Sequence, residues 1–290
     1  MSGVAVVTDS TSSLVPSAAN EAGLVVVPLQ VIVDGRSRPE SFRPDHGSIT
    51  PGAVAAALRE GRSVSTSRPA PEAFTSAYES VAAAGASAIV SVHLSAGISG
   101  TCDAAMTAAR SASVPVIVVD SRTVAPACGF AALEAARVAP AGGSPDEVAE
   151  TARRRAAAAS TWFCVENLDY LRRGGRIGAA QAMLGSALAV KPLLTVTDGK
   201  IAPFERVRTM SRALGRLEQL AMSVLDELEG VGADVAAVHL DNRSAADRLA
   251  RALTGHTALV PGAVTVSEVS AVLGVHCGPG TVGLVVSPRT

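Results

Sequence analysis

Five polar residues stand where predicted strands and helices begin or end, and together they could hold an anion: Thr66, Ser95, Thr101, Arg176 and His276. Hydroxyl, guanidinium and imidazole groups donate hydrogen bonds to carboxylate or phosphate oxygens. The set does not contain the pair of carboxylates that acid–base catalysis often uses. The pattern therefore predicts a site for the anionic head of a ligand.

The turn from Ser95 to Thr101 is central to this prediction. It follows an apolar run over residues 88–94 that is typical of a buried strand, and it precedes a helical pattern over residues 102–112. Backbone N–H groups and hydroxyls point together at a helix N-terminus, where the helix dipole favours an anion. A second hydroxyl-rich turn, over residues 63–69, places Thr66 before another helix in the same way.

Three other interpretations of these residues stay open. Ser95, His276 and Asp9 could form a hydrolase triad, although Ser95 lacks the Gly-x-Ser-x-Gly turn of such enzymes. A phosphotransferase or nucleotide site is a second alternative, but the turn has neither a Walker lysine nor a Gly-x-Gly-x-x-Gly pattern. In the third, Asp9 and Thr66 serve as helix caps and bind no ligand.

The composition excludes several classes of protein. The chain has 290 residues, of which 48% are hydrophobic, and a formal net charge of −1 gives no basic field for nucleic acid. No run reaches about 18 consecutive apolar residues, and Met1 leads almost directly into a strand without the basic region of a signal peptide. Since the four cysteines are scattered, we expect reduced, mostly buried thiols, no metal site and a cytoplasmic protein.

Strands alternate with helices up to about residue 159, which predicts an α/β fold with a mainly parallel, Rossmann-like sheet and helices on both faces. The carboxyl edge of such a sheet forms a ligand crevice, and Asp9, Ser95 and Asp120 follow three of the strands. An antiparallel pair over residues 191–207 then changes the architecture. We expect an N-terminal α/β lobe over residues 1–160 and a C-terminal mixed α/β lobe over residues 161–290, which together form one unit.

The sequence also predicts the local structure of several segments. The segment 50–75 could pack on the C-terminal lobe, and the polar residues 36–48 are expected to form a loop. We expect helices over residues 177–189 and 269–273, and a tight turn over residues 276–281. His93 lies inside a strand pattern, so we expect a hydrogen-bonded histidine of the core or its rim.

Seven motifs stand in the order that characterises the DegV family, whose characterised members are the FakB-type fatty acid-binding proteins. They are Val6-Val7-Thr8-Asp9-Ser10, Thr66-Ser67-Arg68-Pro69, residues 94–101, Leu171-Arg172-Arg173-Gly174-Gly175-Arg176-Ile177, Lys191-Pro192, Arg206-Val207-Arg208-Thr209 and His276-Cys277-Gly278-Pro279-Gly280. Each motif alone is weak, but seven in order are highly specific. The chain resembles this family over essentially its whole length.

The resemblance implies a two-lobed α/β protein that holds a long-chain fatty acid in an apolar tunnel. Such proteins are not enzymes and need no cofactor. They present the bound carboxylate to a partner ATP-dependent fatty acid kinase, and the resulting acyl phosphate enters phospholipid synthesis. No integral membrane segment is expected, and any contact with a membrane would be transient. A lipid-sensing protein without a kinase partner stays open as an alternative.

Motif position also implies roles for individual residues. Thr66, Ser95 and the amide of Ala96 would hold the carboxylate, although many relatives have a second serine where this chain has Ala96. Residues near the head group would be Arg176, His276, Gly97 and Thr101. Arg206 and Arg208 would belong to the kinase-docking face, unless they are ordinary surface charges.

An acyl tail must be surrounded by apolar side chains. Burying about 14 methylenes at ~0.8 kcal/mol each stabilises a complex by on the order of 10 kcal/mol. The expected tail-lining residues, each of which could also be ordinary core, are Ile98, Met106, Met183, Leu184 and Leu188. Cys102 stands where relatives often carry an aromatic residue, which bears on chain selectivity.

Overall fold

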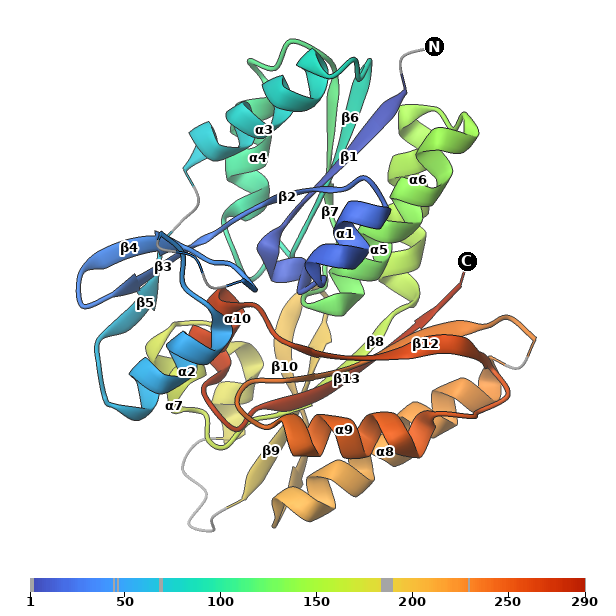
Figure 1. Cartoon of the computed structure of the whole chain (residues 1–290). Helices are drawn as coiled ribbons and strands as arrows, with labels where there is room; N and C mark the ends of the chain where they lie inside the picture. The colour runs from blue at the N-terminus through green and yellow to red at the C-terminus, as the bar shows by residue number, and fades with distance from the viewer. Residues whose placement is uncertain are drawn as a thin grey trace.

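The computed structural model describes residues 3–43, 45, 47–67, 70–183, 190–228 and 230–289, which form three sheets with helices packed around them (Figure 1). The chain passes from the first large sheet to the second between α6, which ends at Ala158, and β8, which begins at Ser160. No helix among the described residues is long and apolar enough to cross a membrane.

The first sheet is entirely parallel and has the strand order β2-β1-β6-β7. Its strands are β1 (Val4–Asp9), β2 (Val25–Val27), β6 (Ala88–His93) and β7 (Val116–Asp120). Its main helices are α3 (Pro71–Ala83), α4 (Thr101–Ala109), α5 (Pro126–Val138) and α6 (Pro145–Ala158). The segment between β1 and β2 forms two short helices, η1 (Ser10–Ser12) and α1 (Pro16–Glu21). The 3-10 helix η2 (Ala139–Ala141) links α5 to α6.

Alternating side chains give this sheet two buried faces. Val6 and Val90 pack with α5 and α6, whereas Val7 and Ile89 pack with α3 and α4. Because successive residues of a strand point to opposite faces, apolar residues at adjacent positions require a cover on both sides. The predicted parallel sheet with helices on both faces is therefore confirmed.

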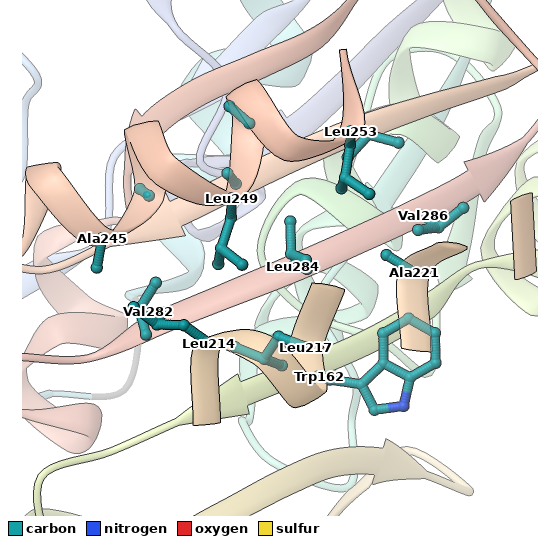
Figure 2. Close-up of a cluster of buried hydrophobic side chains, with 14 of the residues drawn as sticks. Trp162, Leu214, Leu217, Ala221, Ala245, Leu249, Leu253, Val282, Leu284 and Val286 are labelled. Carbon is teal, nitrogen blue, oxygen red and sulfur yellow. The ribbon is translucent and has the colours of Figure 1, made fainter. Parts of the chain in front are cut away.

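The second sheet is mixed and has the order β10-β9-β8-β13-β11-β12, with β11 and β12 parallel and the other neighbours antiparallel. Its strands are β8 (Ser160–Cys164), β9 (Lys191–Thr197), β10 (Lys200–Val207), β11 (Ala233–His239), β12 (Leu259–Glu268) and β13 (Val282–Pro288). Helices α8 (Met210–Glu227) and α9 (Arg243–Leu253) cover one face, where Leu217 and Leu249 pack against Trp162 and Leu284 (Figure 2). The next residue of β13, Val285, faces the opposite side and packs near α5.

A small third sheet, β4-β3-β5, lies beside the two large ones (Figure 1). It contains β3 (Gln30–Val33), β4 (Arg36–Pro39) and β5 (Val64–Thr66), and α2 (Pro51–Arg59) follows β4. Apolar side chains of β3 and α2 pack against α10 (Ala271–Cys277), which belongs to the C-terminal half. Helix α2 and strand β5 thus contact α10, whereas α3, which begins at Pro71, packs on the first sheet.

Three local predictions were wrong. Residues 36–39 form strand β4 instead of a loop, because the turn at Asp34 and Gly35 lets their backbone pair with β3 whatever their side chains. His276 and Cys277 lie in the last turn of α10, whose N-cap is Ser270, instead of in a tight turn. The region after Ile177 forms the 3-10 helix η3 (Gly178–Met183), and the rest of that predicted helix lies outside the described residues.

Candidate functional site

An apolar cavity lies where the turn after β6, the second sheet and α10 meet. The turn contributes Ile98, the sheet contributes Phe163 and Val285, and α10 contributes Leu273 and His276. The short helix α7 (Asp169–Arg173) adds Leu171 to the wall. The lining is therefore mainly apolar and comes from segments that are far apart in the sequence.

The centre of a water-sized molecule can occupy about 60 Å³ of this cavity. One water molecule needs only about 10–15 Å³ of such space, so the segments that meet here leave an open cavity between them.

His276, which lines the cavity, forms a polar pair with Thr66. The Oγ1 atom of Thr66, the last residue of β5, lies 3.0 Å from Nε2 of His276. Burial, and secondarily the positive charge of Arg176, lowers the pKa of His276 to about 4. The imidazole is therefore neutral near neutral pH. Its Nδ1 atom is buried and has no hydrogen-bond partner in the described part of the chain.

Glycine at position 174 makes room for this imidazole. A Cβ atom on Gly174 would lie 2.1 Å from Nδ1 of His276. The guanidinium of Arg176 lines the cavity and donates from Nη1 to the Gly174 carbonyl at 2.7 Å and from Nε to the Ile98 carbonyl at 3.2 Å. Arg176 thus ties the turn after β6 to the loop after α7, and it places a positive charge beside His276.

The Ser95 hydroxyl hydrogen-bonds backbone groups in this structure. Ser95 is buried, and its hydroxyl donates to the Gly199 carbonyl at 2.6 Å and accepts from the Gly97 N–H at 3.1 Å. The Ala96 N–H donates to Oδ1 of Asp120 at 3.2 Å. In this structure, Ser95 therefore anchors the β9–β10 turn.

Two other predicted residues of this turn have structural contacts. A Cβ atom on Gly97 would lie 2.7 Å from the Gly199 oxygen, so glycine permits the close approach of the β9–β10 turn. Thr101 is buried at the first position of α4, and its hydroxyl lies 2.8 Å from that of Ser99. The structure thus brings Thr66, Arg176 and His276 together, whereas Ser95 connects to them through the backbone that carries Ile98.

The structure does not assemble the hydrolase triad that the sequence left open. Asp9 hydrogen-bonds His93 at 2.8 Å and caps η1 through Thr11, and the Ser95 hydroxyl donates to a carbonyl. His93 in turn lies 2.7 Å from the Ser91 hydroxyl, to which Tyr78 donates at 2.9 Å. These groups are buried, so the chain Asp9–His93–Ser91 is a structural network, and the expectation for His93 is confirmed.

The residues predicted to line the tail have different positions. Ile98 lines the cavity, and Met183 packs against the neighbouring cluster that includes Leu171. Met106 is 44% exposed on α4 and is not one of the described lining residues. Leu184 and Leu188 lie outside the described residues.

Several lining residues were missed from the sequence, among them Phe163, Leu273 and Val285. Period-2 alternation along β8 and β13 distinguishes two faces of the sheet, although Trp162 and Leu284, which pack against α8 and α9, also border the cavity. That signal shows that two faces exist. It does not show which face meets a ligand, because this depends on how the sheets pack.

Arg206 and Arg208 are exposed at the edge strand β10 and just after it. Arg206 donates to the Ala182 carbonyl at 2.9 Å, and Phe204 on the same strand is 42% exposed. Within the described ranges, no group of three or more His, Cys, Asp or Glu side chains could hold a metal ion. The four cysteines are free, and three of them are buried.

Comparison with known sequences gives a match over the whole chain. The family model described as "Uncharacterised protein, DegV family" matches residues 3–289. A DegV domain-containing protein of Streptomyces coelicolor is 50% identical over 288 residues, which are 99% of this chain and 99% of that protein.

Two solved structures are similar in fold over their full length. A DegV family protein from Thermus thermophilus, described by its fatty acid binding, has a TM-score of 0.89 and 30% identity, with 99% of this chain and 100% of that chain covered. DegV, a fatty acid-binding protein from Bacillus subtilis, has a TM-score of 0.88 and 28% identity, with 100% of both chains covered.

Proposed function

The chain belongs to the DegV family, and on this premise we propose that it binds a long-chain fatty acid in its apolar cavity and presents the carboxylate to a partner ATP-dependent kinase. The proposal rests chiefly on the cavity, whose lining is mainly apolar and includes Arg176 and His276, the second of which pairs with Thr66. A buried carboxylate must be paired and hydrogen-bonded, and these side chains supply a hydroxyl, an imidazole and a positive charge. The fatty acid binding described for the Thermus and Bacillus proteins supports the same function.

In this proposal the carboxylate lies near Thr66, and Ser95 and Ala96 contribute further donors. The Ser95 hydroxyl and the Ala96 N–H must then exchange their present acceptors, the Gly199 carbonyl and the Asp120 carboxylate, for the ligand. The tail would lie among the apolar side chains that line the cavity, Ile98 among them. The ligand would thus be bound with a local rearrangement of the turn after β6.

Phosphoryl transfer is assigned to the partner, which would supply ATP chemistry to the bound carboxylate and yield an acyl phosphate for phospholipid synthesis. The exposed Arg206 and Arg208 at the β10 edge would form the kinase-docking surface, because positive side chains there suit an acidic partner face. The protein itself would act as the acyl-binding subunit.

Native mass spectrometry of protein purified from cells tests fatty acid binding directly. We expect a bound mass equal to that of a long-chain fatty acid. Thr66→Val should weaken the affinity of delipidated protein about tenfold to a hundredfold, the usual range for a lost hydrogen bond to a charged group. Ser65→Ala, an exposed neighbour on β5, is the matched control and should bind normally. A protein that carries no lipid and binds none when offered it would refute the proposal.

The kinase step needs a separate experiment. Acyl phosphate should form only when the loaded protein, ATP and the partner kinase are combined, and hydroxylamine can trap it. Arg206→Glu with Arg208→Glu should abolish this product while fatty acid affinity stays unchanged. Arg251→Glu, an exposed change on α9, is the control. Normal product formation by the double variant would contradict the docking surface.

A further inference from the structure

A buried carboxyl group that the proposed site does not use lies directly after β4. Glu40 is 6% exposed, and its backbone N–H donates to the Leu29 carbonyl at 2.8 Å, so the small third sheet fixes its position. A buried carboxyl group is costly unless it is hydrogen-bonded. The partners of Glu40 therefore show what its burial achieves.

These partners come from two other parts of the chain. The Oε1 atom of Glu40 accepts from the hydroxyl of Ser10, which lies in η1 just after β1. Its Oε2 atom accepts from the Val272 N–H at 3.0 Å, and the hydroxyl of Ser270, the N-cap of α10, is a third partner. Glu40 thus joins the third sheet to the end of β1 and to the start of α10.

All three partners act as hydrogen-bond donors. The Ser10 oxygen accepts from the Leu29 N–H at 2.9 Å, and the Ser270 oxygen accepts from the Leu273 N–H at 3.1 Å. Each hydroxyl therefore has its own proton available for Glu40. An ionised carboxylate satisfies these donors, whereas the protonated acid brings a further hydrogen into the same group.

Helix α10 connects Glu40 with the cavity. Val272 is the second residue of this helix, the cavity-lining Leu273 follows it, and His276 comes about one turn later. The His276 imidazole lies 3.0 Å from the Thr66 hydroxyl. Four residues of a helix span only about 6 Å, so the bonds that hold the start of α10 also set the position of the imidazole.

From these contacts we propose that Glu40 is a positioning residue for fatty acid binding, and that its ionised carboxylate holds α10 where Leu273 and His276 meet the ligand. The inference rests on the proposed function and names a residue that controls it. Protonation of Glu40 removes an acceptor from the start of α10 and lowers the fraction of binding-competent protein. The apparent affinity falls by that fraction.

This role predicts a pH dependence of affinity with a definite sign. Burial raises the pKa of Glu40 to about 7, so the ionised fraction rises from about one tenth at pH 6 to about nine tenths at pH 8. Fatty acid affinity should therefore rise about tenfold over this range. The contribution of Glu40 to folding stability changes in the opposite sense, because the folded state favours the protonated acid. A purely structural role would make affinity follow stability.

Other titratable groups lie near Glu40 and enter the design of the test. Asp9, at the end of β1, raises the pKa of Glu40 by its charge, and it is hydrogen-bonded to His93 of β6. Asp45 borders the same surface pocket as Glu40. His276, with a pKa of about 4, stays neutral over this pH range. Glu40→Gln retains all these groups and the carboxyl of the ligand, so the difference between variant and wild type isolates Glu40.

Calorimetry of stearic acid binding to the delipidated full chain between about pH 6 and pH 8 tests the inference. Glu40→Gln keeps the size of the side chain without its charge, so the ratio of wild-type to variant affinity should rise about tenfold across the range. Glu268→Gln is the matched control. Burial also raises the pKa of Glu268 on β12, but no hydrogen bond joins its side chain to α10 in the described structure. It should keep the wild-type profile.

Ser10→Ala provides a second, milder variant. It removes one donor to the carboxylate, which raises the pKa of Glu40 further, so the midpoint of the affinity profile should move up by about one pH unit. An unchanged midpoint would overturn the inference even if Glu40→Gln failed to fold.

A ratio of wild-type to Glu40→Gln affinity that is constant with pH, or that falls as the pH rises, would also overturn it. If stearic acid bound to none of these proteins at any pH, the proposed function itself would fail. Tight binding by the wild type and by Glu40→Gln at every pH leaves the proposed function standing and removes the inference alone.

Discussion

Two buried titratable groups, Glu40 and His276, should give the stability of this protein opposite dependences on pH. Burial is the main cause in both cases. It raises the pKa of Glu40 from 4.5 to about 7, although hydrogen bonds from Ser10 and Val272 lower it and the charge of Asp9 raises it further. It lowers the pKa of His276 from 6.5 to about 4, with a contribution from Arg176.

The folded state therefore favours neutral His276. As the pH falls from 6.5 toward 4, the unfolded chain takes up a proton at His276 that the folded chain does not, so stability is lost in this window. Glu40 behaves in the opposite way. Its folded state favours the protonated acid, so stability is gained as the pH falls from about 7 to 4.5.

Each shift spans roughly two and a half pKa units, equivalent to about 3 kcal/mol when fully expressed. Between about pH 7 and pH 4.5, each group should change the free energy of unfolding by about 2 kcal/mol, which is most of its full contribution. In the wild type the two contributions nearly cancel. Single substitutions should reveal them with opposite signs.

The perturbations are His276→Gln and Glu40→Gln, because glutamine resembles the neutral form of each group in size and polarity. The free energy of unfolding is measured by urea denaturation at several pH values between about 7 and 4.5. Relative to wild type, His276→Gln should gain about 2 kcal/mol as the pH falls, and Glu40→Gln should lose about the same amount. The double variant should show no net change from these two positions.

Differences from wild type that do not vary with pH, or slopes of the same sign in both variants, would show that burial does not shift the two pKa values in opposite directions. A constant offset at every pH is expected and does not count against it. Such an offset reports the altered hydrogen bonds, for instance between Glu40 and the Val272 N–H at 3.0 Å.

The remaining predictions concern packing and helix capping. Gly174→Ala should weaken fatty acid affinity at least about tenfold, because the new Cβ would displace the His276 imidazole from Thr66. Gly215→Ala on α8 is the control, since the space around its Cβ is open, and it should leave the fatty acid affinity measured by calorimetry unchanged. Leu249→Ala should cost about 3 kcal/mol in urea denaturation, since Leu249 is a fully buried residue of α9, and fatty acid affinity should persist because Leu249 does not line the cavity. Ser144→Ala should cost about 1 kcal/mol by the same assay, because it removes the capping box of α6; no loss would mean that the box does not form in solution.

Local chemistry in the sequence was sufficient to predict the architecture of the first sheet. The strand that ends at Asp9 and the one that ends at His93 are short apolar runs, and Asp9 also caps the 3-10 helix that follows, so each signal lies within a few residues. The same reasoning missed β4, because a polar edge strand has no apolar pattern and is held by backbone pairing. It also ended α10 too early, since the last turn of that helix carries His276 and Cys277.

The sequence by itself determined the family, through the order of seven motifs, and the polar residue types at strand and helix ends. The tertiary structure decided which of those residues meet. Thr66 and His276 are 210 positions apart and come within 3.0 Å because α10 packs against β3, β5 and α2. Ser95, by contrast, turns toward the Gly199 carbonyl. Periodicity and capping depend on neighbours in the chain, whereas these contacts depend on how whole elements pack, which no local pattern encodes.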